Sequence, residues 1–547
     1  MAATRESLDA GNAGPAAGND YGFLAAAPLR PGSAFFILPL VHGSSDAQLS
    51  IACTWQGSGQ YANRHLGLDR APFSSVIECS KHHSDRPNPR VGSFQRDRIK
   101  MSSELLTPGA KQARRRRGRA TTSVTTSRER VEAAIAHRET DMVPLDLGGS
   151  QGTGMHPDSV YKLRQALQLD RPGTPVKIVE PFLLLAEIEP DLLEALGVDV
   201  VGLRTPTTRL GFRNDGWKPW TTFGGTPVLV PEGFNTEPEP SGEILAYPCG
   251  DKTVAPCARM PQGGFYFDAF SRQEPIDDDN LRVEDNLEEY KPISEADLAY
   301  LEAESERLEA TGRAILATFG GTTFGALGVD SGLALKHPKG IRGVEEWIMS
   351  TSLRRDYLYE VFDRQCEIAL ANLEKIHGVV GERVTAVWIT GTDFGMQQGP
   401  FISPASYRSL FKPFHSKVND WIHTHTTWKT FIHSCGSIWR LLDEIVDAGF
   451  DCINPVQTSA AEMNPADLKA KYGGRVTFWG GGIDTQKVLP FGTPHDVRDM
   501  VRERMRIFGT GGGYIFNPIH NVQAGVPVEN LLALYEAVDK YRHYPLA

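Results

Sequence analysis

The sequence predicts an α/β protein built as a closed (β/α)8 barrel, the TIM-barrel fold. The last third of the chain alternates short apolar segments with amphipathic ones in five consecutive units of roughly 30 residues. Such alternation is typical of parallel strands joined by helical crossovers. Earlier apolar segments at residues 142–149, 199–203 and 314–319 bring the number of expected strands close to eight. This number favours a closed barrel over an open, doubly wound sheet.

The expected elements follow from local residue patterns. The N-cap candidate Ser127 starts an amphipathic helix that we expect to reach residue 137. A second helix is expected at residues 157–167, hairpins at 228–267, and a long helical region at 344–377. The five C-terminal strand and helix pairs are expected at residues 386–390 and 403–424, 430–433 and 438–449, 452–454 and 465–472, 477–480 and 494–508, and 514–517 and 528–541.

The first 120 residues have a different composition from the rest of the chain. They are rich in Gly, Ala, Ser and Arg, contain the basic run 114–117, and show no sustained helical or strand period. Such a run fits a nucleic-acid patch, a nuclear address or a transit segment, as well as a disordered tail. We expect residues 1–120 to be a disordered or wrongly assigned N-terminal extension, with the barrel in residues 121–547. We assign no function and no nucleic-acid partner to the extension.

Composition indicates an ordinary soluble protein. The chain has 547 residues, 40% hydrophobic residues and a formal net charge of −10. It has no stretch of about 18 apolar residues, so we expect no membrane span. Its 7 cysteines are irregularly spaced, which favours a reducing, cytoplasmic environment over a disulfide framework. Two of them, Cys249 and Cys257, are expected to be plain loop cysteines.

A His-x-Cys pair is the most informative local pattern. His433 and Cys435 lie at the C-terminal end of an expected strand, two positions apart, so their side chains face the same way. A nitrogen and a sulfur donor side by side suit zinc. By itself such a pair is also typical of a buried His beside an inert core Cys.

Polar residues recur at the C-terminal ends of the other expected strands, the pole that carries the active site of (β/α)8 barrels. His520 is the candidate for a third metal ligand. Asp393 is expected to be a fourth ligand or a general base, Gln457 to orient substrate through its amide, and Asp484 to be a further catalytic candidate. Each carboxylate is also compatible with a turn-stabilising role. Three protein ligands would leave one coordination position open, as in catalytic zinc sites.

Five segments make the chain from about residue 127 onward resemble the uroporphyrinogen decarboxylase superfamily. They lie, in matching order, at residues 127–144, 399–404, 433–436, 480–484 and 526–530. The resemblance implies a barrel fold and one of two chemistries. One branch of the superfamily decarboxylates a porphyrinogen without a metal. The other contains zinc-dependent methyltransferases that move a methyl group between a corrinoid protein and a thiol or small methylated substrate.

The methyltransferase branch is implied more strongly. It uses a His-x-Cys pair and a distal Cys as zinc ligands, and the chain matches the pair with His433 and Cys435. At the distal position it has His520 in place of the Cys. A zinc site with a His ligand at this position is less suited to thiol activation, but it is still compatible with methyl transfer from another methyl donor. The corrinoid would arrive on a partner protein, because the chain lacks an Asp-x-His-x-x-Gly motif. We therefore expect a zinc-dependent methyltransferase that acts on a small molecule, and the protein could form a homodimer.

The decarboxylase branch carries an Arg-Gln-Ala-Gly-Arg motif after its first strand. The corresponding segment here, residues 147–154, contains no arginine. Arg204 and Arg209 follow the second expected strand and, with Gln397, are candidates for substrate binding, because guanidinium groups pair with carboxylates. Decarboxylation of a porphyrinogen or other polycarboxylate is therefore the alternative function. A non-catalytic barrel that acts as a binding protein is the second alternative.

Overall fold

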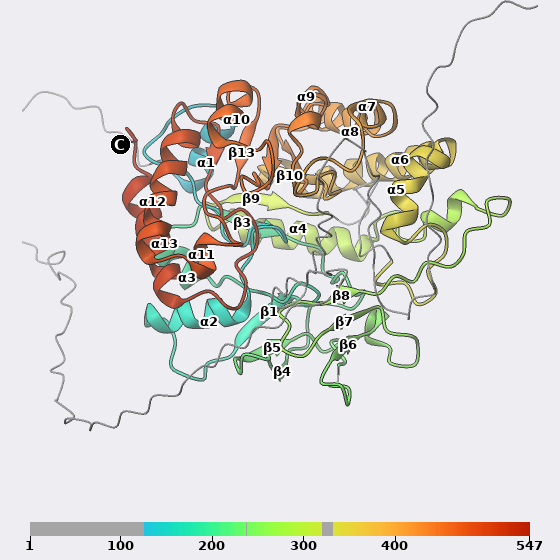
Figure 1. Cartoon of the computed structure of the whole chain (residues 1–547), viewed down its shortest axis with the longest axis horizontal. Helices are drawn as coiled ribbons and strands as arrows, with labels where there is room; N and C mark the ends of the chain where they lie inside the picture. The colour runs from blue at the N-terminus through green and yellow to red at the C-terminus, as the bar shows by residue number, and fades with distance from the viewer. Residues whose placement is uncertain (1–124, 237, 320–331, 547) are drawn as a thin grey trace, which may run out of the picture. The chain divides into compact units, whose positions relative to one another are not determined.

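The computed structural model describes residues 125–236, 238–319 and 332–546, so the expected N-terminal extension lies outside the described residues. Its central feature is a sheet of seven parallel strands, several of which are labelled at the centre of Figure 1. In spatial order the strands are β14 (Tyr514–Ile515), β13 (Thr477–Trp479), β12 (Cys452–Asn454), β11 (Lys429–His433), β10 (Ala386–Thr390), β9 (Ala314–Ala317) and β3 (Val200–Leu203).

Residues 143–147 connect the two edges of this sheet and close the barrel. Leu145 forms a parallel bridge with Phe516, directly after β14. On the other side, the Leu145 carbonyl accepts a hydrogen bond of 2.8 Å from the backbone N–H of Asp199, directly before β3. The segment therefore takes the place of an eighth strand, and the (β/α)8 prediction is confirmed.

The predicted strand at residues 142–149 nevertheless forms only isolated bridges. Pro144 has no N–H to donate to a ladder. The backbone N–H of Leu145 donates to the Asp199 carboxylate at 2.9 Å instead of to a strand carbonyl. Gly148, at φ +84°, then turns the chain away from the extended conformation.

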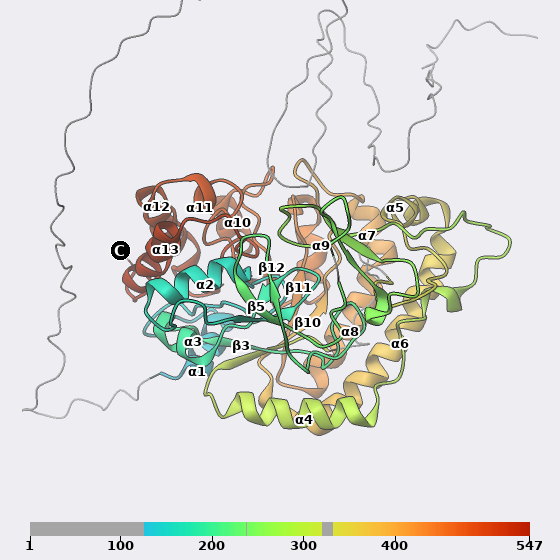
Figure 2. The ribbon, with the colours of Figure 1, turned by 90° about the horizontal axis from the view of Figure 1, so that it is seen from below.

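Helices surround the barrel strands (Figures 1 and 2). They are α1 (Ser127–Ile135), α2 (Pro157–Ala166), α3 (Pro190–Leu196), α4 (Glu295–Glu309), α5 (Val344–Leu353), α6 (Arg355–Val380), α7 (Pro404–Leu410), α8 (Lys412–His425), α9 (Leu442–Asp447), α10 (Pro465–Tyr472), α11 (Val488–Phe491), α12 (Pro494–Arg504) and α13 (Val528–Tyr541). Two predictions need correction. Thr126, not Ser127, is the N-cap of α1. The helix expected at 403–424 is divided at Phe411, because Pro413 cannot donate a helical hydrogen bond.

Two small sheets lie in the segment that leads up to β9. The first contains β2 (Leu185–Ala186), β1 (Val176–Glu180), β5 (Pro227–Val230) and β4 (Lys218–Thr221); the second contains β6 (Ile244–Ala246), β7 (Ala258–Met260) and β8 (Asp268–Ala269). The antiparallel β6–β7 and β7–β8 pairs correspond to the hairpins expected at residues 228–267. Figure 1 shows both sheets in the lower half of the view.

The interior of the barrel is packed with side chains. Trp388, Phe431 and Trp479 are buried together with small and branched residues of the other strands. Successive side chains on a strand alternate between its two faces. His433, two positions after the interior residue Phe431, therefore belongs to the next interior layer, at the C-terminal ends of the strands.

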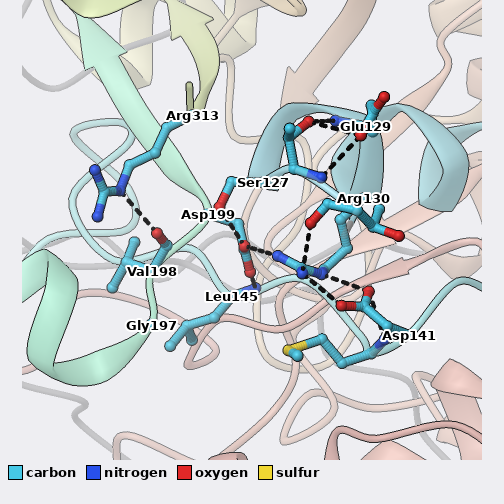
Figure 3. A network of polar contacts seen from close by, with 12 residues as sticks. Ser127, Glu129, Arg130, Asp141, Leu145, Gly197, Val198, Asp199 and Arg313 are labelled. Carbon is cyan, nitrogen blue, oxygen red and sulfur yellow. Dashed lines mark hydrogen bonds and ion pairs between the residues drawn. The ribbon is translucent and has the colours of Figure 1, made fainter. Parts of the chain in front are cut away.

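The opposite end of the barrel carries a buried ion network (Figure 3). Asp199, which is almost fully buried, accepts hydrogen bonds from Ser127, Arg130 and the backbone N–H of Leu145. Its Oδ2 atom, which accepts from Leu145, also accepts from the Arg542 guanidinium. The network links α1, the closing segment, β3 and the C-terminal end of α13, so it stabilises the scaffold away from the strand ends that carry the candidate site.

None of the helices in the described parts of the chain combines the length and apolar character needed to cross a membrane.

Candidate metal centre

Three predicted ligands meet at the C-terminal ends of the strands. His433, Cys435 and His520 each offer a ligand atom, and these atoms all lie within 4.8 Å of one another. The Sγ atom of Cys435 is 3.4 Å from Nε2 of His433. His433 ends β11 and Cys435 follows it, whereas His520 follows β14. Barrel closure therefore brings together residues that are almost ninety positions apart in the sequence, as predicted.

Asn454 fixes the orientation of the His433 ring. The amide Nδ2 of Asn454 donates to the backbone carbonyl of Trp479 at 2.8 Å, so its Oδ1 faces His433. That oxygen lies 2.6 Å from Nδ1 of His433, which must therefore be the protonated ring nitrogen. Nε2 is left with a lone pair directed toward Cys435. This is the arrangement that a metal-binding imidazole needs.

The His433 ring is also held by close packing. Trp388 stacks on it with ring centroids 4.8 Å apart and an interplanar angle of 16°. Gly152 also approaches the ring so closely that a Cβ atom there would lie 2.7 Å from Cε1 and 2.8 Å from Nδ1 of His433. Only glycine leaves room for the ring at this position.

The turn after β11 is fixed by neighbouring strand ends. The backbone N–H of Cys435 donates to Asp393 at 2.7 Å, and that of Gly436 donates to Oε1 of Gln457 at 2.7 Å. Gly436 has φ +84° and packs directly on the backbone of Gly395. Asp393 and Gln457 therefore both shape the turn that carries Cys435.

Burial controls the charge of the candidate ligands. It lowers the pKa of His433 and of His520 to about 4, so both imidazoles are neutral near pH 7. Burial, with the Asp393 carboxylate as the second cause, raises the pKa of the Cys435 thiol well above its usual range. Two neutral nitrogen donors and a thiol can accept a cation, and binding would release the thiol proton.

The two arginines predicted to bind substrate face protein groups. Nη2 of Arg204 donates to the backbone carbonyl of Gly148 at 2.7 Å. Glu180 lies within electrostatic reach of Arg204 and Arg209, and Asp393 is a further acidic neighbour of Arg209. The guanidinium of Arg209 also stacks 5.0 Å from the ring centroid of Phe182.

Two other candidates, Asp484 and Gln397, make contacts within neighbouring loops. Oδ1 of Asp484 accepts the backbone N–H groups of Gln486 and Lys487 at 2.7 and 2.9 Å. This is the turn-stabilising arrangement that the sequence left open for Asp484. Gln397 is exposed, and its backbone carbonyl accepts from the N–H of Ala461. Neither residue belongs to the three-donor group.

Sequence reasoning missed Asn454 and Gly152. A signal for Asn454 existed, because it ends the strand beside β11 and pairs in register with His433. Gly152 is more than 280 positions before His433, and no local pattern indicates their contact. The residues of the centre therefore come from several strand ends and from the loop after the first barrel segment.

The donor set fits zinc. A sulfur and a nitrogen ligand of one tetrahedral zinc ion lie about 3.6 Å apart. The 3.4 Å between Sγ of Cys435 and Nε2 of His433 agrees with that spacing. The carboxylate of Asp393 is outside the three-donor group, so this group offers three candidate ligands among the described residues.

The part of the chain that carries these donors matches a known protein family. Residues 370–541 match the family model described as uroporphyrinogen decarboxylase (URO-D). This region belongs to the uroporphyrinogen decarboxylase superfamily. It includes β10 to β14 and all three candidate ligands.

Curated relatives of this URO-D-like region carry the name uroporphyrinogen decarboxylase. The protein from Actinobacillus succinogenes is 33% identical over 106 residues, which cover 19% of this chain and 27% of the relative. The protein from Idiomarina loihiensis is 22% identical over 209 residues, 36% of this chain and 56% of the relative. The chain thus spans between about a quarter and just over half of the length of these two relatives.

A solved structure, a methyltransferase from Methanosarcina mazei, aligns with 76% of this chain and 99% of its own, at 15% identity and a TM-score of 0.43.

Proposed function

We propose that the protein is a zinc-dependent methyltransferase of the uroporphyrinogen decarboxylase superfamily. It would move a methyl group between a small methylated substrate or thiol and a corrinoid carried by a partner protein. The observation that supports this proposal is the group formed by His433, Cys435 and His520, with ligand atoms within 4.8 Å of one another. Decarboxylation without a metal would not require two imidazoles and a thiol to lie together at the active-site pole.

The residues of the centre have distinct proposed roles. His433, Cys435 and His520 would hold the ion and leave one coordination position for substrate. A bound zinc ion would lower the pKa of a thiol that enters this position and thus supply a nucleophile near pH 7. Asp393 fixes the backbone of Cys435 and lies within electrostatic reach of His520. We assign it the acceptance of the proton that an incoming thiol releases.

Decarboxylation of a polycarboxylate is the alternative. The names of the curated relatives and the positions of Arg204 and Arg209 after β3 favour it. The charges around the arginines do not, because Glu180 already serves as a counter-charge for both guanidinium groups and Asp393 serves as another for Arg209. A substrate with several carboxylates needs cationic groups that are not already neutralised within the protein.

Metal analysis of the purified full-length protein tests the proposal. We expect about one zinc ion per chain, as a three-ligand site requires. The Cys435→Ser variant should retain less than about half an equivalent, because it removes the thiolate ligand. Cys249→Ser is the matched control, since Cys249 is an exposed cysteine outside the three-donor group and its replacement should leave the zinc content unchanged.

Activity assays separate the two chemistries. With methylcobalamin and a small thiol as probes, the zinc-loaded protein should demethylate the corrinoid, and a chelator should abolish the reaction. Release of carbon dioxide from a porphyrinogen that persists after zinc removal would instead establish the decarboxylase alternative. A wild-type protein that contains no zinc and has no affinity for it would refute the proposal.

A further inference from the structure

Asp146 is a buried carboxylate without an assigned role, at the C-terminal end of the segment that closes the barrel. Its side chain is 0% exposed. Oδ2 accepts a hydrogen bond of 2.8 Å from the indole Nε1 of Trp479, and Oδ1 accepts one of 2.9 Å from the backbone N–H of Gly149. A buried carboxylate held mainly by neutral donors destabilises a fold, so its presence calls for a function.

One route from Asp146 to the metal centre runs through the barrel strands. Asp146 fixes the indole of Trp479 at the end of β13. The backbone carbonyl of Trp479 accepts from Nδ2 of Asn454 at 2.8 Å, and Oδ1 of Asn454 lies 2.6 Å from Nδ1 of His433. Two residues thus link the carboxylate to the imidazole through three successive hydrogen bonds.

A second route runs through the loop at residues 149–154. Asp146 anchors the start of this loop at Gly149, and the Thr153 side chain also bonds to the carboxylate. Between these two anchors, Gly152 packs directly against the His433 ring. The loop is pinned on both sides of Gly152 by Asn521, which accepts from the N–H of Gly154 at 2.7 Å and donates to the carbonyl of Gln151 at 2.9 Å.

The second route also involves the third candidate ligand. Asn521 directly follows His520 in the chain. The loop anchored on Asp146 therefore contacts the His433 ring and holds the residue next to His520. A displacement of the loop would change the separation of the two imidazoles, because one ends β11 and the other follows β14.

We propose that Asp146 is a positioning residue of the metal centre, which keeps Nε2 of His433 directed toward Cys435 and His520. This inference rests on the proposed function, because it assumes that the three donors bind zinc. Burial raises the pKa of Asp146 to about 6, while the Trp479 and Gly149 donors oppose that rise and favour the ionised form that accepts both bonds. An asparagine would offer one acceptor where two donors converge.

The test compares the Asp146→Asn variant with a matched carboxylate variant. Asp451→Asn is the control, because Asp451 also accepts a backbone N–H and a side-chain donor but directly precedes β12, at the opposite end of the barrel. Zinc affinity of the apo full-length protein is measured by competition with a chromophoric chelator. We expect Asp146→Asn to weaken zinc binding by about 10-fold or more, the effect of losing outer-shell support for a metal ligand. Asp451→Asn should bind zinc with wild-type affinity.

A second measurement needs no metal. Nitrogen-15 NMR of histidine-labelled apo protein reports which nitrogen of His433 carries the proton. The wild type should show a single Nδ1–H tautomer, and Asp146→Asn should show a mixture of tautomers. If Asp146→Asn does not fold, Trp479→Phe removes the indole donor alone and is expected to give the same two changes.

The outcomes separate this inference from the proposed function. A folded Asp146→Asn variant with wild-type zinc affinity and an unchanged His433 tautomer would overturn the positioning role and leave the zinc site intact. A wild-type protein with no affinity for zinc would overturn the proposed function, and the positioning role with it. Equal losses of zinc affinity in Asp146→Asn and Asp451→Asn would show a general effect of instability, which also contradicts the inference.

Discussion

Replacement of Asn454 should separate metal binding from fold stability. Asn454 makes two buried hydrogen bonds: it accepts from Nδ1 of His433 and donates to the carbonyl of Trp479. Leucine has nearly the same size and makes neither bond. Aspartate keeps the acceptor for His433 and loses the amide donor. The pair Asn454→Leu and Asn454→Asp therefore isolates the bond that orients the imidazole.

The expected magnitudes follow from these two bonds. Loss of an outer-shell acceptor weakens metal binding by about 10–100-fold, which corresponds to about 1.4–2.7 kcal/mol. Asn454→Leu should show this loss. Asn454→Asp loses the bond to Trp479 but should lose clearly less zinc affinity than Asn454→Leu, because a carboxylate also supports a metal-bound imidazole. Each buried polar group left without a partner costs about 1–3 kcal/mol of stability. Both variants leave the Trp479 carbonyl unpaired, so both should be less stable than wild type.

Two assays on the full-length apo protein check this prediction. Chelator competition at pH 7.5 gives the zinc dissociation constant, and urea unfolding followed by circular dichroism gives the free energy of unfolding. Wild-type zinc affinity in folded Asn454→Leu would contradict the assigned role of the Asn454–His433 bond. An equal loss of zinc affinity in the aspartate and leucine variants would also contradict it, because the acceptor would then be irrelevant.

Three further predictions follow from the structure. Gly152→Ala places a methyl group 2.7 Å from Cε1 of His433, so the ring or the loop must shift, and we expect zinc affinity in chelator competition to fall about 10-fold. Asp199→Ala leaves the buried guanidinium groups of Arg130 and Arg542 without their shared carboxylate, and urea unfolding should show a free energy of unfolding lower by about 3–5 kcal/mol. Asp141→Ala removes an exposed carboxylate of the same network and should lower the free energy of unfolding far less. Burial lowers the pKa of His415 to about 3, so on acidification the unfolded chain binds a proton at this residue near pH 6.5 and the folded chain does not. Between pH 7.5 and 5.5 this residue should therefore reduce the free energy of unfolding by about 1.4 kcal/mol. Urea unfolding of His415→Phe at the two pH values should lack that part of the pH dependence.

The repeated strand and helix units were predictable because each has a strong local pattern. The bounds of β10, β12, α10 and α13 are those expected from the sequence. The closing segment was harder, because Pro144 removes a ladder donor and the Asp199 side chain replaces a strand carbonyl. That replacement depends on a residue more than fifty positions away, so no local window contains it.

The candidate site was also predictable only in part from the sequence. His433 and Cys435 are visible in the sequence because two ligand types share one face of a strand end. Their supporting residues are not, since an asparagine that ends the next strand and a glycine in a distant loop have no ligand chemistry of their own. The role of Asp484 depended on backbone N–H directions, which residue types do not specify. Sequence thus indicates ligands better than the groups that orient them.

The architecture explains why a match to decarboxylases need not carry their chemistry. β10 to β14 provide the scaffold over which the superfamily match extends, and packed residues such as Trp388 and Phe431 fill its interior. The proposed chemistry depends on a few side chains at the ends of these strands, and each can change without repacking the interior. A chain can therefore keep the barrel and exchange arginine anchors for metal donors. His433, Asn454 and Trp479 lie on three neighbouring strands and are linked by hydrogen bonds. The sheet therefore fixes the orientation of the imidazole, as the proposed metal centre requires.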